Sequence, residues 1–294
     1  MNAVVDRISS EDPFGFKPLW NAILEVYEVF RLICAKYGLR HFATGGTAIG
    51  ALRHKGFIPW DDDFDVAMPR PDYERFLKIV EDELPSNLKL VNWKNTKEFG
   101  LTFSKIQETR RSYVESVENA CGFVLSNGIY LDIFPIDGDK KPGTLASNFM
   151  RFKLKFIAAL ERFHCHSFME QSRAGKIGWI LGMVISPFCP FLRTHHQCLS
   201  AIEKIITANP YEDDERTFQI GQGLTCYVSV EAKGVWKEMK EVSYERTSIM
   251  ISSRCEDYLR AQFGDFMTPP PVELRRPSHS NSRHVSWWLG PTGE

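Results

Sequence analysis

Apolar residues recur every three or four positions near the start of the chain, at Leu19, Ile23, Val26, Phe30 and Ile33. This spacing places them on one face of a helix over residues 18–36, and Gly38 is a typical residue to end it. A second amphipathic pattern covers residues 71–84, with a proline in the first turn and Pro85 directly after it. The pattern therefore predicts two amphipathic helices in the first third of the chain.

Short apolar runs beside these helices are typical of strands. They lie at residues 39–44, 64–68, 88–92, 101–106, 112–116 and 128–134, and a short helix is expected at 47–53. After the polar, turn-rich segment 140–144 the pattern is mostly helical. Helices are expected at 145–168, 177–185, 195–207 and 255–263, with short strands or loops at 218–230 and 235–250. We therefore divide the chain into a core (18–140), a mostly helical region packed on it (141–282) and a disordered tail (283–294).

The composition is that of a globular protein, since 43% of the 294 residues are hydrophobic and 13% are aromatic. Lysine and arginine total 36 against 37 aspartate and glutamate, so no global basic field supports binding of a nucleic acid polymer. The seven scattered cysteines are an odd number, which is typical of reduced thiols in a cytoplasm. Residues 1–16 contain no apolar segment typical of a signal peptide. We therefore expect a cytoplasmic protein.

The longest apolar run, residues 177–192, is interrupted by Pro187 and Pro190 and is too short to span a bilayer comfortably. We interpret it as a buried helix. Several basic residues precede it, at Arg151, Lys153, Lys155, Arg162, Arg173 and Lys176. A peripheral contact with the inner face of a membrane is therefore the alternative interpretation.

The most informative segment is residues 44–65, where a strand, a Gly-Gly-Thr turn, a short helix and an acidic strand are expected in succession. Its acidic part carries Asp61, Asp62, Asp63 and Asp65. Alternate residues of a strand face the same way, so Asp63 and Asp65 should project to one side with Phe64 opposite. Two such carboxylates repel unless a cation lies between them, and Mg²⁺ prefers oxygen ligands. Asp63 and Asp65 are therefore candidate ligands of Mg²⁺ or Mn²⁺.

Alone, a Gly-Gly-Thr is usually a turn and a run of aspartates is usually a solvated loop. Together they suit phosphoryl or nucleotidyl transfer, because a glycine turn at a helix N-terminus can hold phosphate beside a metal. The candidate phosphate-binding residues are Gly45, Gly46, Thr47, Arg53, His54, Lys55 and Lys105. The basic residues 53–55 fit a surface loop equally well. Trp60 could stack on a base, but we favour an anchor for the loop.

The run Gly-Ile-Tyr-Leu-Asp-Ile-Phe at residues 128–134 reads as another strand, with a carboxylate at Asp132. A charged residue in a central strand needs a partner. Asp132 is either a third carboxylate at the metal, with Asp63 and Asp65, or a solvent-facing residue of an edge strand. We favour the first interpretation. Asp137, in the following Pro-Ile-Asp-Gly, is more simply a turn residue.

These motifs resemble those of a known family. The stretch from Gly45 to Val66 looks like the signature of the LicD family, which includes bacterial phosphocholine transferases. The animal proteins fukutin and fukutin-related protein are distant relatives of that family. Residues 130–137 and 258–270 resemble its later motifs and fall in the expected order. The resemblance spans residues 20 to 280.

The LicD family is similar to the nucleotidyltransferases of the DNA polymerase β superfamily. The resemblance implies an α+β fold, with a mixed sheet flanked by helices and a helical C-terminal half on the acceptor side. It also implies Mg²⁺-dependent transfer of a phospho-alcohol, such as phosphocholine, from a CDP-linked alcohol donor to a sugar hydroxyl. The acceptor would be a glycan or lipid-linked glycan of the cell surface, such as lipopolysaccharide or teichoic acid. Asp63, Asp65 and Asp132 would then be the catalytic residues and the metal ligands.

Three other functions use parts of the same pattern. A nucleotidyltransferase that moves NMP from an NTP would need the same carboxylates. A glycosyltransferase also uses Asp-x-Asp with a metal, but that class lacks the glycine turn. A non-catalytic nucleotide- or glycan-binding module would not need Asp63, Asp65 and Asp132 intact.

Overall fold

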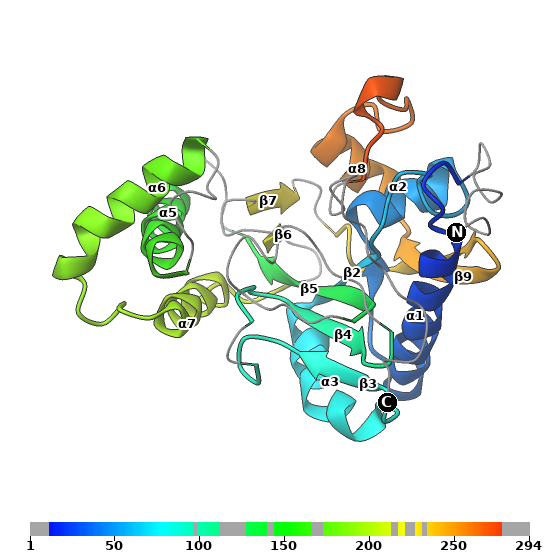
Figure 1. Ribbon diagram of the computed structural model, residues 1–294, viewed down its shortest axis with the longest axis horizontal. Helices are drawn as coiled ribbons and strands as arrows, with labels where there is room; N and C mark the ends of the chain where they lie inside the picture. The colour runs from blue at the N-terminus through cyan, green and yellow to red at the C-terminus, as the bar shows by residue number, and fades with distance from the viewer. Residues whose placement is uncertain are drawn as a thin grey trace, which may run out of the picture.

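The structure, a computed structural model, describes residues 12–96, 99–111, 128–139, 144–165, 173–212, 217–220, 227–230 and 234–277 (Figure 1). In the main sheet β1-β2-β5-β4-β3 lie in that order, and β6 and β7 extend from β5. The strands are β1 (Phe42–Ala43), β2 (Asp65–Pro69), β3 (Leu88–Val91), β4 (Ser104–Glu108), β5 (Tyr130–Gly138), β6 (Thr217–Ile220) and β7 (Tyr227–Val230). Strands β2 and β5 pair in parallel, whereas β1–β2, β4–β5 and β5–β6 are antiparallel. The predicted α+β class with a mixed sheet is therefore confirmed.

Two helices, α1 (Lys17–Tyr37) and α3 (Arg70–Glu83), cover one face of the sheet and contact each other. The rings of Phe30 and Phe76 meet between them, with centroids 5.3 Å apart. Tyr73 of α3 is hydrogen bonded to Ser104 of β4 at 2.6 Å, so Ser104 faces the helices. Because side chains alternate along a strand, the next residue, Lys105, faces away from them. This second face of the sheet carries the candidate site.

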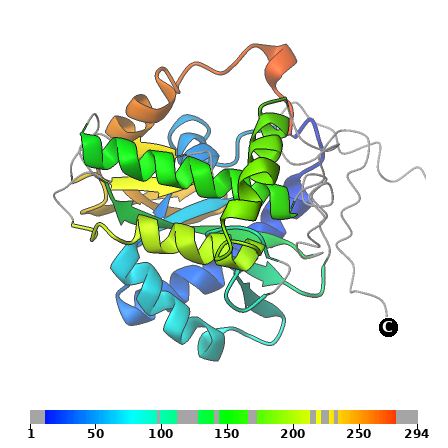
Figure 2. The same ribbon diagram turned by 90° about the vertical axis from the view of Figure 1, so that its left-hand side faces the viewer.

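Helices α2 (Gly45–Arg53) and α8 (Cys255–Phe263) lie side by side on the side of the sheet away from α3 (Figures 1 and 2). The hairpin of β8 (Met239–Tyr244) and β9 (Thr247–Ser252) packs against β1. A short 3₁₀ helix, η4 (Val272–Leu274), follows α8. Side chains of the hairpin and of α8 belong to the same core as α1 and β2. The C-terminal elements of the described chain therefore pack into the same hydrophobic core as the N-terminal helix.

Helices α5 (Leu145–Cys165), α6 (Arg173–Ile185) and α7 (His195–Ile206) form a separate group at one end of the molecule (Figures 1 and 2). The 3₁₀ helix η3 (Ser186–Phe188) follows α6. The group has an apolar cluster of its own, which includes Met150, Leu154, Leu160, Cys198 and Ile202. The predicted helices of this region are present. The division of the chain at residue 140 stays a prediction.

Several expectations differ in detail from the structure. Helix α2 begins at Gly45 rather than at Thr47, so the two glycines form its first turn. The strand expected at 39–44 is reduced to β1, and the one expected at 101–106 starts at Ser104. The predicted strand at 112–116 and the predicted tail at 283–294 lie outside the described residues.

The interpretation of residues 177–192 as a buried helix is wrong. Helix α6 forms as expected, but Ile177, Leu181 and Val184 are 59%, 50% and 58% exposed. Within the described ranges, no helix is long and apolar enough to cross a membrane.

The burial of His41 predicts a loss of stability in acid. Its side chain is 3% exposed and lies against the rings of Tyr27 and Phe30. Burial lowers its pKa from 6.5 to about 4. The unfolded chain therefore binds a proton near pH 6.5 that the folded chain accepts only near pH 4. Stability should be lost as the pH falls between these values, by roughly 3 kcal/mol.

Urea unfolding near pH 7 and near pH 4 measures this loss. Other carboxylates titrate over the same range, so the comparison is with His41→Gln. That variant should lose less free energy of unfolding between the two pH values than the wild type does. Equal losses in the two proteins would show that His41 does not cause the acid sensitivity.

Candidate active site

Three charged side chains lie abreast across the sheet. Asp65 begins β2, Asp132 lies on β5 and Lys105 lies on β4. The strand registers pair Asp132 with Asp65 on one side and with Lys105 on the other. Paired residues of neighbouring strands point to the same face, so all three project away from α1 and α3. The sheet therefore brings together two carboxylates and one ammonium group.

Lys105 and Asp132 form a buried ion pair. Lys105 Nζ lies 3.3 Å from Asp132 Oδ1, and the two side chains are 1% and 0% exposed. The Lys105 ammonium group also lies 3.5 Å from the centre of the Tyr130 ring. A buried carboxylate without a cation costs several kcal/mol, so Lys105 stabilises the ionised Asp132. The alternative that Asp132 faces solvent from an edge strand is wrong, because β5 has neighbours on both sides.

The loop immediately before β2 carries Asp61 and Asp63. Trp20 of α1 fixes this loop, because its Nε1 donates to the carbonyl oxygen of Asp61 at 2.8 Å. The Trp20 ring also stacks on Phe57, with centroids 5.0 Å apart. Since β2 begins only at Asp65, Asp63 is positioned by the loop and not by the alternation of a strand. Asp63 is buried, at 7% exposure.

The Gly-Gly-Thr turn is bonded directly to the acidic strand. The Asp65 backbone N–H donates to Thr47 Oγ1 at 2.9 Å. A Cβ atom at Gly45 would lie 3.3 Å from Asp65 Oδ2, and one at Gly46 would overlap with the Asp61 carboxylate. One carboxylate from the loop and one from the strand therefore meet at the first turn of α2. This is also the positive end of the helix dipole.

Two buried tyrosines from late in the chain reach the same place. The Tyr258 hydroxyl lies 2.6 Å from Thr44 Oγ1 and accepts a hydrogen bond from the Gly45 N–H at 3.2 Å. Burial raises the pKa of Tyr258 to about 12. The Tyr244 hydroxyl has no hydrogen-bond partner among the described residues. Burial, and then the charge of Asp61 and other nearby acidic groups, raise the pKa of Tyr244 well above its usual value.

Of the predicted basic residues, Arg53 and His54 lie together beside the acidic loop. Arg53 Nε donates to His54 Nδ1 at 3.3 Å, and Arg53 Nη1 donates to the Phe266 carbonyl at 2.5 Å. Burial, followed by the charges of Arg53 and Arg275, lowers the pKa of His54. Arg275 lies 5.3 Å from the centre of the Trp60 ring. We call Arg53, His54 and Arg275 the basic group.

The structure places the other two predicted basic residues elsewhere. Lys55 is exposed in a turn with a φ of 61°, and its carbonyl oxygen accepts a hydrogen bond from the Glu245 N–H at 2.8 Å. Lys105 lies in the buried pair described above. Sequence reasoning gave no role to Arg275, Tyr244 or Tyr258, although Tyr258 opens the third resembling motif.

The acidic side chains have the oxygen chemistry that Mg²⁺ prefers. In the part of the chain that the structure describes, no group of three or more His, Cys, Asp or Glu residues is arranged to hold a metal ion. Mg²⁺ is usually bound by one or two carboxylates, with waters and substrate phosphates completing its shell. The meeting of Asp61 and Asp65 at the first turn of α2 fits that donor set. Asp63, Asp65 and Asp132 as metal ligands stay a prediction.

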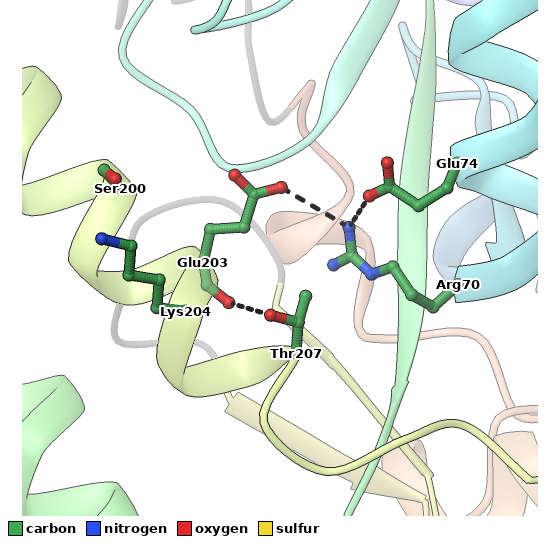
Figure 3. A pocket seen from close by; sticks show the side chains of 6 residues that line it. All are labelled: Arg70, Glu74, Ser200, Glu203, Lys204 and Thr207. Carbon is green, nitrogen blue, oxygen red and sulfur yellow. Dashed lines mark hydrogen bonds and ion pairs between the residues drawn. The ribbon is translucent and has the colours of Figure 1, made fainter.

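A second charged cluster lies between α3 and α7 (Figure 3). Arg70 of α3 donates to both carboxylate oxygens of Asp137, each at 2.7 Å. Glu74 at 3.2 Å and Glu203 of α7 at 3.9 Å also approach Arg70. Asp137 is therefore not the turn residue we predicted but a buried residue of β5, and burial raises its pKa despite Arg70. The cluster joins the helical group to the core.

The fold and the site together define a class. A mixed sheet whose acidic strand lies beside a helix that starts with two glycines is the arrangement of a nucleotidyltransferase-like domain. The family described as LicD/FKTN/FKRP, nucleotidyltransferase domain, matches residues 38–164. The match identifies residues 38–164 as similar to this family, and the matched range includes the glycine turn, the acidic loop and β5.

Two relatives are similar to this chain. The lipopolysaccharide cholinephosphotransferase LicD of Haemophilus influenzae is 24% identical over 271 residues, which cover 89% of this chain and 95% of that protein. An uncharacterized protein of Rickettsia typhi is 35% identical over 48 residues, or 16% of each chain. The first similarity therefore extends beyond the matched domain to the helical group and the returning C-terminal elements.

Replacing Tyr258 with phenylalanine should lower the free energy of unfolding by about 1–2 kcal/mol. The change removes a hydroxyl group that bonds to both Thr44 and Gly45. Tyr244→Phe is the matched control, because its hydroxyl is equally buried and has no partner within the described residues. That variant should be neutral or slightly more stable. Urea unfolding measures both, and equal destabilisation would mean that the hydrogen bonds of Tyr258 add nothing.

Proposed function

We propose that this protein transfers a phosphocholine-like phospho-alcohol group from a CDP-linked donor to a sugar hydroxyl of a cell-surface glycan or its precursor. The acceptor class we favour is lipopolysaccharide. The proposal is supported by the match of residues 38–164 to the LicD/FKTN/FKRP family and by the similarity to a lipopolysaccharide cholinephosphotransferase along most of the chain. One observation carries it: the carboxylates of Asp61 and Asp65 meet at the glycine turn, next to the buried Asp132.

The acidic residues are proposed to bind Mg²⁺, or Mn²⁺, through Asp63, Asp65 and Asp132. When bound, the ion would neutralise charge on the donor diphosphate and make its phosphorus more electrophilic. The Lys105 ammonium group, 3.3 Å away, offsets the charge of the buried Asp132 carboxylate. Asp132 therefore has a charged neighbour on each side of β5: Lys105 on β4 and Asp65 on β2.

The donor phosphates are proposed to lie at the first turn of α2. The Gly45 N–H already donates to Tyr258, so the next amides, those of Gly46 and Thr47, are the ones assigned to phosphate. The basic group supplies two guanidinium groups near the acidic loop, those of Arg53 and Arg275. A guanidinium group can donate two parallel hydrogen bonds to the oxygens of one phosphate, and this geometry would orient the donor. Lys55, in its exposed turn, stays a predicted phosphate-binding residue outside the basic group.

Calorimetric titration with CDP-choline, CDP-ribitol and CDP-glycerol, each with and without Mg²⁺, tests the donor. We expect Mg²⁺-dependent binding of one CDP-alcohol, followed by release of CMP when a lipopolysaccharide acceptor is added. Tight binding of CTP with release of pyrophosphate would favour the nucleotidyltransferase alternative. Tight binding of a nucleotide-sugar would favour a glycosyltransferase. Binding without any turnover would favour a non-catalytic module.

A further inference from the structure

Helix α6 turns its large apolar side chains to solvent. Ile177, Ile180, Leu181 and Val184 follow the spacing of one helical face and are 59%, 44%, 50% and 58% exposed. In a globular protein such a stripe normally faces the core. Phe188 and Phe191, directly after the helix, are 82% and 85% exposed. We call these six residues the α6 apolar surface.

The opposite face of α6 explains this orientation. Gly178 and Gly182 face α5, where a Cβ atom at Gly182 would overlap with the Ala159 carbonyl. A Cβ atom at Gly178 would lie 2.8 Å from Arg162 Nη1. Two small residues four positions apart allow helices to approach closely without a layer of large apolar side chains between them. Because the glycine face of α6 packs closely against α5, the apolar side chains on its other face point to solvent.

The surrounding charge is strongly basic. Residues 145–206, which include the three helices, contain eight lysine or arginine residues and three glutamates, in a chain whose totals are 36 basic and 37 acidic. Lys153, Lys155 and Arg193 are exposed, whereas Glu161 is buried 3.1 Å from His195. Figures 1 and 2 show α6 on the outside of the helical group, at the end of the molecule opposite α1. An exposed apolar surface and a positive field therefore coincide at one end of the protein.

We propose that the α6 apolar surface docks the protein onto an anionic lipid bilayer. Apolar side chains of an interfacial helix enter the boundary between headgroups and acyl chains, while lysine and arginine attract anionic headgroups. The 13 residues of α6 extend about 20 Å, less than the ~30 Å of a hydrocarbon core, so the helix lies on the membrane rather than across it. The proposal does not depend on the transfer reaction.

Flotation of the full chain with lipid vesicles tests the proposal. The wild type should float with vesicles that contain phosphatidylglycerol, and less with phosphatidylcholine alone or at high salt. The double substitution Phe188→Ser with Phe191→Ser should weaken partition into the anionic vesicles about tenfold or more. Both side chains are largely exposed, so folding should be retained, and circular dichroism checks this.

The control is Val272→Ser with Leu274→Ser, which removes two apolar side chains that are 71% and 65% exposed outside the helical group. This pair should leave vesicle binding unchanged. No flotation of the wild type with anionic vesicles would overturn the proposal, and so would equal binding by the Phe188/Phe191 variant. The alternative is that a second copy of the chain covers this surface, and light scattering tests it. A wild-type dimer that does not bind lipid and that dissociates in the Phe188/Phe191 variant would assign the surface to dimer formation.

Discussion

Replacing Asp65 with asparagine should lower the rate of phospho-alcohol transfer by about 10³-fold and leave the protein folded. The substitution keeps the size of the side chain but removes its charge beside the first turn of α2. The backbone bonds of Asp65 to Thr47 and Thr44 do not involve the side chain and should persist. Initial rates with a labelled CDP-alcohol donor and saturating Mg²⁺ measure the effect.

Asp82→Asn is the matched control, because Asp82 is an exposed carboxylate near the end of α3, outside the site. Its rate should equal that of the wild type. Urea unfolding of both variants separates a loss of chemistry from a loss of structure. A wild-type rate in folded Asp65→Asn would remove this carboxylate from the catalytic residues, whatever the donor proves to be.

The local parts of the fold could be predicted because helical periodicity is a property of neighbouring residues. Helix α8 has the predicted bounds, Cys255–Phe263, and α1 and α3 differ from prediction by a residue or two. The pairing of strands could not be predicted in the same way. The register that aligns Asp65, Asp132 and Lys105 joins segments far apart in the chain, and a slip of one residue would turn each side chain to the other face.

The limits of pattern reasoning are visible at two places. The Gly-Gly-Thr motif indicated a phosphate-binding turn, but only the tertiary structure shows that the Tyr258 hydroxyl accepts a hydrogen bond from the Gly45 N–H and that Arg275 lies over the Trp60 ring. The apolar run of α6 indicated a buried helix. This prediction was wrong because hydrophobicity alone does not specify which face of a helix packs against the rest of the protein. The glycine spacing at 178 and 182 was the sequence signal that could have suggested the opposite orientation.

Replacing Lys105 with methionine should lower the free energy of unfolding by about 3–5 kcal/mol. Methionine fills a similar volume, but it leaves the carboxylate of Asp132 buried without the ammonium group that lies 3.3 Å away. Urea unfolding at neutral pH measures the loss. Lys36→Met is the control, since Lys36 pairs with Glu83 at 2.7 Å on the surface, where solvent screens the pair. That variant should unfold almost like the wild type, and a similar result for Lys105→Met would mean that the buried pair does not stabilise the fold.

The double variant Lys105→Met with Asp132→Leu decides why the chain keeps this pair. Buried ion pairs can often be replaced by apolar residues of similar volume without loss of stability, whereas removal of one partner alone is costly. The double variant should therefore recover most of the stability that Lys105→Met loses. It should also stay inactive, because it lacks the carboxylate proposed to act with Asp65. Recovery of stability without activity would mean that Asp132 is retained for chemistry and Lys105 for holding its charge inside the sheet. A double variant no more stable than Lys105→Met would instead show that other contacts of these side chains hold the strands together.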